Sequence, residues 1–239
     1  MLPFEVALPV GAIAFYVYDC GMLLFDNELL LVAQTGRWRV TGGGRTVIFG
    51  KRICVPAPLA PWALVFRTYW SENDKRDDLP VAWPPPSLVL ALRPVMLICG
   101  ALLLLLLVVL PVVSLRFGTG LALLGIFGLY YILMLGALVI VYVRRRLLGL
   151  DRKSFWLLAI DVLACAPFAI NLVRKITLRQ ATPVRPLDFG KSHLDARHQE
   201  QLAAMVMSRV DEMLAREECG SQRALHLAAL RTQLQRETA

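Results

Sequence analysis

The chain has 239 residues, of which 57% are hydrophobic and only 18% are charged, with a formal net charge of +8. Soluble domains average about 45–50% apolar and about 25% charged residues, so this composition predicts a protein that contacts a lipid bilayer. It excludes a disordered chain, a collagen-like chain and a disulfide-stabilised scaffold. The five cysteines are irregularly spaced and are interpreted as small buried hydrophobic residues.

The excess positive charge stands beside apolar stretches, which is typical of residues that set membrane topology. Seven basic residues are interpreted in this way: Arg144, Arg145, Arg146, Arg152, Lys153, Arg174 and Lys175. Basic flanks are retained on the cytoplasmic side, and each attracts anionic headgroups by about 1 kcal/mol. We therefore expect a bilayer with anionic headgroups as a partner, and no nucleic acid.

Residues 1–25 are predicted to contain the first membrane helix, because the apolar run 6–25 has about the 20 residues that a span needs. Its β-branched and aromatic residues would also suit two strands that turn near residues 19–21. Length and near-absence of charge favour the helix. The uncharged start places the N-terminus outside the cytoplasm, and it lacks the basic region of a secretory signal peptide.

Residues 26–86 are predicted to form a small β-rich domain outside the membrane, on the cytoplasmic side. Three short β-prone runs are separated by turn-forming residues and are followed by a proline-rich end: 29–32, 37–41 and 46–49. A hairpin or a three-stranded sheet is expected. The nearby glycines do not form a phosphate-binding loop, because Arg45 and Arg52 occupy positions that require glycine and Ser or Thr.

Residues 87–143 are predicted to form a transmembrane helical hairpin. The runs 95–115 and 120–143 are each long enough to cross about 30 Å of hydrocarbon, and a short link joins them. Pro94 is expected at the start of the first helix and Pro111 is expected to kink its end.

Residues 144–181 are predicted to comprise a basic cytoplasmic loop and a fourth apolar segment, 154–173. The acid Asp161 offsets much of the segment's hydrophobicity, and both flanks are basic. A span would export one basic flank, so an interfacial or re-entrant helix is slightly favoured. Four full spans, which would export the tail, remain the alternative.

Residues 182–239 are predicted to be a soluble tail of two amphipathic helices. Leu202, Val206 and Val210 form an apolar stripe, and Ser192 with Asp195 resembles a capping box. The helices would pack on each other or on the membrane, or bind a partner protein or a second copy. Cytoplasmic placement of the tail is favoured.

Three polar residues inside apolar segments are the candidate intramembrane site: Asp19, Asp161 and Asn171. Such residues mark ion pairs, helix contacts or polar pathways. A structural role is favoured, with Arg93, Arg152 or Arg174 as possible partners of Asp161. No catalytic triad or metal-ligand spacing is found, so no cofactor is expected.

The sequence therefore predicts an all-α polytopic inner-membrane protein with three or four hydrophobic helices, a small β-rich loop domain and a helical tail. The favoured function is a non-enzymatic scaffold or accessory subunit that presents the loop domain and tail to partners. The alternative is a small transporter component or membrane-bound enzyme with a polar site around Asp161 and Asn171.

Overall fold

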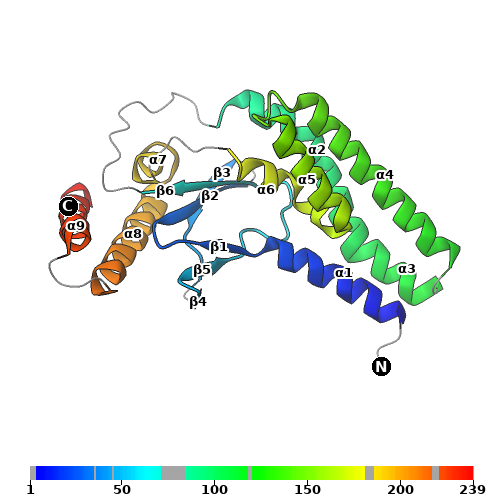
Figure 1. The fold of residues 1–239 in the computed structure, drawn as a ribbon, viewed down its shortest axis with the longest axis horizontal. Helices are drawn as coiled ribbons and strands as arrows, with labels where there is room; N and C mark the ends of the chain where they lie inside the picture. Colours follow the sequence, from blue (N-terminus) through cyan, green and yellow to red (C-terminus); the bar gives the residue numbers. More distant parts are fainter. Residues whose placement is uncertain are drawn as a thin grey trace. The chain divides into compact units, whose positions relative to one another are not determined.

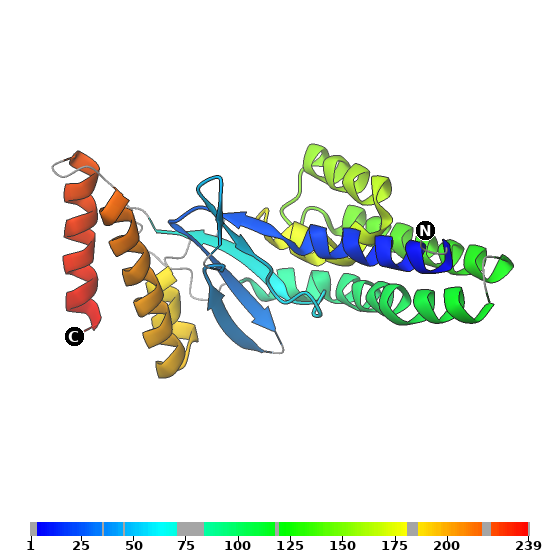
Figure 2. The same ribbon diagram turned by 90° about the horizontal axis from the view of Figure 1, so that it is seen from below.

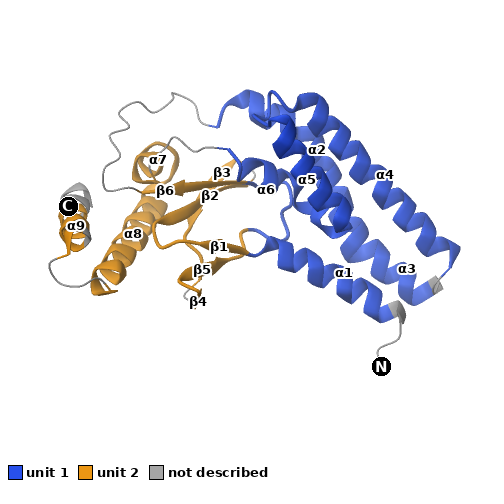
Figure 3. Ribbon diagram, in the orientation of Figure 1, with its two compact units in different colours: residues 1–21, 57–64, 81–180 blue, residues 22–56, 65–80, 181–239 orange. Residues whose placement is uncertain are grey.

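The computed structural model describes residues 4–34, 36–44, 46–70, 84–117, 120–180, 186–216 and 221–238. It is mostly helical with two small antiparallel sheets, and it divides into two compact units (Figures 1 and 3). Unit 1 contains Met1–Gly21, Ala57–Leu64 and Val81–Gln180. Unit 2 contains Met22–Pro56, Val65–Pro80 and Ala181–Ala239.

Two long apolar helices of unit 1 lie side by side (Figures 1 and 2). The first comprises α2 (Pro86–Leu104), the π-helical turn η1 (Leu105–Val109) and α3 (Leu110–Phe117), and the second is α4 (Leu121–Arg144). Arg144 at the end of α4 donates to the carbonyl of Ala91 near the start of α2 at 3.1 Å. The two helices are therefore antiparallel, and each is long and apolar enough to cross a membrane.

Prolines shape the first of these helices. The helix begins at Pro86, which occupies a first-turn position where its missing N–H costs little. Pro94, expected at the helix start, instead lies inside α2. Just before Pro111, the Leu110 N–H bonds to the carbonyl of Leu105, five residues back. Pro111 has no backbone N–H to donate to the carbonyl four residues back, and the turn before it is widened into a π-helical turn.

The first segment is a helix, α1 (Phe4–Cys20), and not a pair of strands. It ends five residues before the expected boundary at residue 25. The next residues form β1 (Met22–Leu24), whose backbone groups bond to another strand and so cannot continue the helix. Within unit 1, α1 packs against α3 and η1 and against the later 3-10 turn η2 (Ala166–Asn171).

The fourth apolar segment is a broken helical hairpin. It comprises α5 (Arg152–Ala164), η2 and α6 (Leu172–Thr177), with an extended residue, Cys165, after α5. Residues that come later in the second arm contact residues that come earlier in the first arm. Lys175 bonds to Asp161 at 2.5 Å, and Arg179 donates to the carbonyl of Ser154 at 2.6 Å. The chain therefore turns back on itself within this segment, which we call the 152–177 hairpin.

The tip of the 152–177 hairpin reaches the middle of the long helices. The hydroxyl of Tyr130 donates to the carbonyl of Ala166 at 3.0 Å. At about 1.5 Å per residue, Tyr130 lies about 21 Å from the Arg144 end of α4 and about 14 Å from the Leu121 end. On α2, the thiol of Cys99 donates to the carbonyl of Ala169 at 3.5 Å.

Unit 2 contains both sheets. In the first, β5 (Lys51–Cys54) lies between β1 and β4 (Val47–Ile48), with antiparallel pairing throughout. In the second, β2 (Glu28–Gln34) lies between β3 (Arg37–Thr41) and β6 (Leu64–Tyr69). The expected β-rich character of this region is confirmed, with two three-stranded sheets in place of one.

The tail helices are part of the same unit as the strands. They are α7 (Pro186–His193), α8 (Ala196–Arg216) and α9 (Gln222–Thr238). One core joins β2 to the tail: Leu29, Leu194, Leu202, Val206 and Val210. Residues 26–86 and 182–239, which the sequence suggested were separate regions, thus contribute to one core.

The start of α8 differs from the predicted capping box. Ser192 lies inside α7, and the cap is Asp195, whose carboxylate accepts from the backbone N–H of His198 at 2.9 Å. This hydrogen bond and one to the His198 side chain lower the pKa of Asp195. Residues 217–220, where the link between the two tail helices was expected, lie outside the described residues.

Candidate functional site

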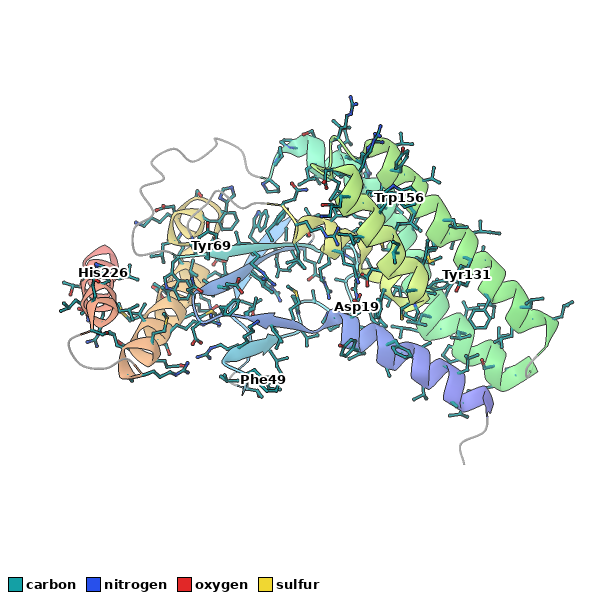
Figure 4. All side chains as sticks on the ribbon, viewed as in Figure 1. Asp19, Phe49, Tyr69, Tyr131, Trp156 and His226 are labelled. Carbon is teal, nitrogen blue, oxygen red and sulfur yellow. The ribbon has the colours of Figure 1, made fainter. Side chains whose placement is uncertain are left out.

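Four polar side chains in unit 1 join the end of α1 to the 152–177 hairpin. We call Asp19, Asp161, Asn171 and Lys175 the hairpin cluster. Figure 4 shows Asp19 at the end of α1. The hairpin arms supply the other three residues, Asp161 from α5, Asn171 from η2 and Lys175 from α6.

Lys175 is the centre of the hairpin cluster. Its Nζ lies 2.7 Å from Oδ1 of Asp19 and 2.5 Å from Oδ2 of Asp161. The side chains of Asp19 and Lys175 are only 11% and 17% exposed, whereas that of Asp161 is 42% exposed. The pair with Asp19 is therefore largely removed from solvent, and Asp161 forms the open side of the cluster.

Asn171 completes the bonding of Asp19. Its amide Nδ2 donates to Oδ2 of Asp19 at 2.9 Å, so both carboxylate oxygens of Asp19 have partners. Asn171 is fully buried, and its amide also contacts the thiol of Cys20. A buried polar group without a partner would cost about 1–3 kcal/mol, so these bonds let an asparagine occupy the interior of the unit.

A second cation lies beside the cluster. The guanidinium of Arg174 is buried, and it donates to the carbonyls of Cys20 at 3.3 Å and Ala57 at 3.4 Å. The two carbonyls give this buried charge hydrogen-bond partners, without which an enclosed ionised group would be strongly destabilising.

The structure brings together all three of the predicted polar residues. The partner of Asp161 is Lys175, and not one of the three arginines considered from the sequence. Lys175 and Arg174 were predicted to face lipid headgroups, but both bond to groups inside unit 1. Sequence reasoning missed this because Asp19 and Lys175 are distant along the chain.

The other predicted topology residues lie at the same end of the α2–α4 pair. Arg144 bonds to the start of α2, and the guanidinium of Arg145 lies 4.5 Å from the ring centroid of Tyr142. The remaining three, Arg146, Arg152 and Lys153, are exposed. These residues form a cationic rim where α4 ends and α5 begins.

Unit 2 contains a further buried cation, Arg209, which sequence reasoning missed. Arg209 of α8 is 3% exposed and donates to the carbonyls of Asp26 at 3.0 Å and Glu28 at 2.8 Å, and to that of Gly42. Burial lowers its pKa from the ordinary value. Arg209 lies next to Val210 within the buried stripe of α8, which was the available signal for its role.

Ion pairs surround this arginine. Arg52 of β5 bonds to Asp26 at 3.3 Å and to Glu212 of α8, and Arg216 bonds to Asp26 at 2.7 Å. With Arg209, we call these residues the tail-anchor network. It joins the loops of the strand region to α8.

A groove of about 500 Å³ lies along α7 and α8. Leu187, Leu202 and Met207 give it an apolar lining, and Gly190 and Ala203 are among its small residues. Lys191 and Glu200 also line the groove and give it one charge of each sign.

Among the described residues, no group of three or more His, Cys, Asp and Glu side chains is placed to hold a metal ion. Comparison of the chain with protein-family models, curated protein sequences and solved structures found no match. The function must therefore be argued from the geometry of the two units.

Proposed function

We propose that the chain is an integral membrane protein that acts as a non-enzymatic adaptor. In this proposal the α2–α3 helix and α4 span the bilayer, α1 inserts beside them, and the 152–177 hairpin is re-entrant. Unit 2 is the cytoplasmic module that binds a partner protein. The observation that carries the proposal is the single core that the strand region and the tail share.

The shared core constrains the topology. Unit 2 folds from residues 22–56 and from the tail, so both must lie on the same side of the bilayer. If α2–α3 and α4 both span, α4 ends on the side where α2 began. Because residues 65–80 before α2 also belong to unit 2, the segment between α4 and the tail must then cross the bilayer an even number of times or not at all. A single crossing by residues 154–173 is incompatible with this fold.

The hairpin geometry supports a segment that enters and returns. Its arms are antiparallel, with Lys175 against Asp161 and Arg179 against Ser154. Its tip contacts Tyr130 in the middle of α4. In the 3-10 turn at the tip, Ala169, Ile170 and Asn171 are fully buried, while residues 166–168 are half-buried. Irregular backbone is tolerated at membrane depth where it is buried in protein or lines a water-filled cavity.

The cationic rim supports a cytoplasmic position for unit 2. Arg144, Arg145 and Arg146 end α4, and Arg152 and Lys153 begin α5. Basic residues next to membrane helices are retained on the cytoplasmic side. The rim and the start of α2 share one end of the helical pair, as the bond from Arg144 to Ala91 shows.

The topology can be tested by labelling with a membrane-impermeant maleimide in sealed inside-out vesicles. Arg39→Cys in β3 and Leu225→Cys in α9 are both expected to gain a label, because both would face outward from these vesicles. Gly120→Cys, in the turn before α4, has room for a side chain and is expected to stay unlabelled. Native Cys20, Cys54 and Cys99 are buried, whereas Cys165 is half-buried and Cys219 lies outside the described residues, so each variant is compared with the parent chain.

Labelling of Arg39→Cys and Leu225→Cys from opposite sides would contradict the shared cytoplasmic module. Labelling of Gly120→Cys from the same side as both would contradict the two spans. Detergent permeabilisation provides the positive control, because all three variants should then react.

The adaptor role is assigned to the α7–α8 groove, whose apolar lining and small residues suit an apolar segment of a partner protein. Deleting the tail would not test this role, since deletion removes Leu202, Val206 and Val210 from the core of unit 2. A surface change is needed instead. Ala203→Glu places a charge in the groove, and Ser208→Glu places the same charge on an exposed position of the same helix.

We expect Ala203→Glu to lose proteins that co-purify with the parent chain and Ser208→Glu to keep them. Both variants should reach the membrane in equal amounts, which quantitative blotting of membrane fractions checks. Retention of the same partners by both variants would contradict binding at the groove.

A second candidate function rests on the open side of the hairpin cluster. Asp161 is 42% exposed beside the largely buried Lys175, and such a group could exchange a proton or an ion. Asp161→Asn separates the candidates. A polar pathway predicts loss of a cellular phenotype at unchanged abundance, whereas a structural ion pair predicts loss of abundance in the same proportion.

A further inference from the structure

We propose that the exposed face of the β1–β5–β4 sheet, with Phe49 at its tip, binds the interface of the same bilayer that unit 1 enters. The occupant is the boundary between the phospholipid headgroups and the acyl chains. This inference rests on the proposed membrane location. It adds a second attachment, through unit 2.

The strand register separates the two faces of this sheet. Leu23 pairs with Ile53, and Ile48 pairs with Lys51, so these four side chains share one face. Alternating residues on the opposite face are buried: Leu24, Arg52 and Cys54. One face therefore belongs to the core of unit 2, and the other is apolar and open.

The open face carries large hydrophobic side chains that the rest of the chain does not fully cover. Leu23, Phe25, Ile48 and Val55 are between 41% and 49% exposed. Lys51 lies 4.4 Å from the ring centroid of Phe25, so a cation is held against the same apolar surface. A face that combines aromatic and aliphatic groups with a lysine matches the chemistry of a membrane interface, where acyl chains lie beneath charged headgroups.

The β4–β5 turn is the most exposed apolar feature of the sheet. Phe49 is 97% exposed and has a φ of +50°, and Figure 4 shows it beside the β4–β5 turn. Gly50 also has a positive φ, of +72°, as the two central residues of a tight two-residue hairpin turn require, and this turn geometry directs the Phe49 side chain away from the sheet core. Neighbouring Val47 is also 41% exposed, although its pairing with Arg52 places it on the opposite side of the sheet from Ile48.

Chain continuity favours lipid over a protein as the occupant. Only Gly21 separates the end of α1 from the start of β1, and Pro56 and Val55 separate β5 from the segment that returns to unit 1 at Ala57. A strand advances about 3.3 Å per residue, so Leu23 lies within about 10 Å of the end of an inserted helix. In this proposal, the edge strand β1 and the central strand β5 are thus tethered close to the membrane surface.

Photo-crosslinking of the full-length chain in lipid nanodiscs tests the proposal. The residue p-benzoylphenylalanine is placed at Phe49, at Val139 on α4 and at Leu225 on α9, in nanodiscs of equal parts phosphatidylglycerol and phosphatidylcholine. All three native side chains are exposed, at 97%, 62% and 64%, so little packing is lost. Intact mass spectrometry detects a phospholipid adduct.

We expect phospholipid adducts at positions 49 and 139 in comparable yield, and none above background at 225. Adducts at 139 but not at 49 would overturn this inference while leaving the membrane spans in place. Absence of adducts at 139 as well would overturn the proposed membrane location itself. Crosslinking at 49 to another protein in native membranes, without a lipid adduct, would assign the face to a protein partner and also overturn the inference.

Discussion

Two enclosed cations, Lys175 in unit 1 and Arg209 in unit 2, are stabilised in different ways. In unit 1, Lys175 of the hairpin cluster bonds to two carboxylates, Asp19 and Asp161. In unit 2, Arg209 of the tail-anchor network bonds mainly to backbone carbonyls, including those of Asp26 and Glu28. Lysine is a compact charge, whereas the guanidinium group has five donors in a fixed plane and can hold several carbonyls at once.

The difference indicates what each cation connects. Lys175 neutralises charge among apolar segments, so its loss should leave an unbalanced carboxylate. Arg209 donates to the backbone carbonyls of Asp26, Glu28 and Gly42, so its loss should leave these carbonyls without that donor. We therefore expect the larger local effect in unit 2, confined to that unit, and a smaller effect in unit 1.

Arg209→Met should have the largest effect, about 4 kcal/mol of destabilisation in unit 2, because buried carbonyls and nearby acids lose their partner. Hydrogen exchange of peptides from β2 and α8 measures it, with peptides from α4 as the internal reference. Arg197→Met on the exposed side of α8 is the matched control and should change stability by less than about 0.5 kcal/mol. Equal exchange in both variants would break the comparison.

Lys175→Met should destabilise unit 1 by about 3 kcal/mol, because the carboxylate of Asp19 would then be enclosed without its counter-charge. Thermal unfolding in detergent and hydrogen exchange of α1 peptides report the change. Lys153→Met, at an exposed position near the start of α5, serves as control. A change as small as that of the control would mean that the hairpin cluster contributes little to stability.

Gly42→Ala should cost about 2 kcal/mol, because the added Cβ would overlap the guanidinium of Arg209 and lie 2.9 Å from the sulfur of Met205. Gly44→Ala is a close control, since its Cβ would be no nearer than 3.6 Å to any neighbour. Denaturant titration followed by hydrogen exchange compares the two. Equal stability of both variants would show that Arg209 is not held tightly at Gly42.

Acidification should have the smallest effect, at the start of α8. Hydrogen bonds from His198 lower the pKa of Asp195 in the folded chain. The stabilisation is therefore present above the ordinary aspartate pKa of 3.8 and is lost as the pH falls through the lower folded value. Exchange of the first turn of α8 should increase over that range. Asp195→Asn keeps a capping group and should remove the pH dependence; an unchanged pH dependence would contradict this assignment.

Particular residues show how far the sequence could predict the site. Asp19, Asp161 and Asn171 stood out because polar groups are costly within apolar runs, and that cost is local information. Their common partner, Lys175, resembled an ordinary basic flank. Arg209 was hidden for a similar reason, since an arginine near the apolar stripe of an amphipathic helix can extend its charge to solvent unless tertiary contacts enclose it.

By itself, the sequence determined the helices and β-prone runs, because hydrophobic periodicity, prolines and turn residues act over a few neighbouring positions. It left open the course of residues 154–173, since the polar residues within that segment nearly offset its hydrophobicity and the basic flanks favoured an interfacial or re-entrant helix only slightly. Only the tertiary structure showed that this segment folds back toward Tyr130 and that the tail completes the core of the strand region. Both results depend on contacts between residues far apart in the chain, whose burial no local pattern specifies.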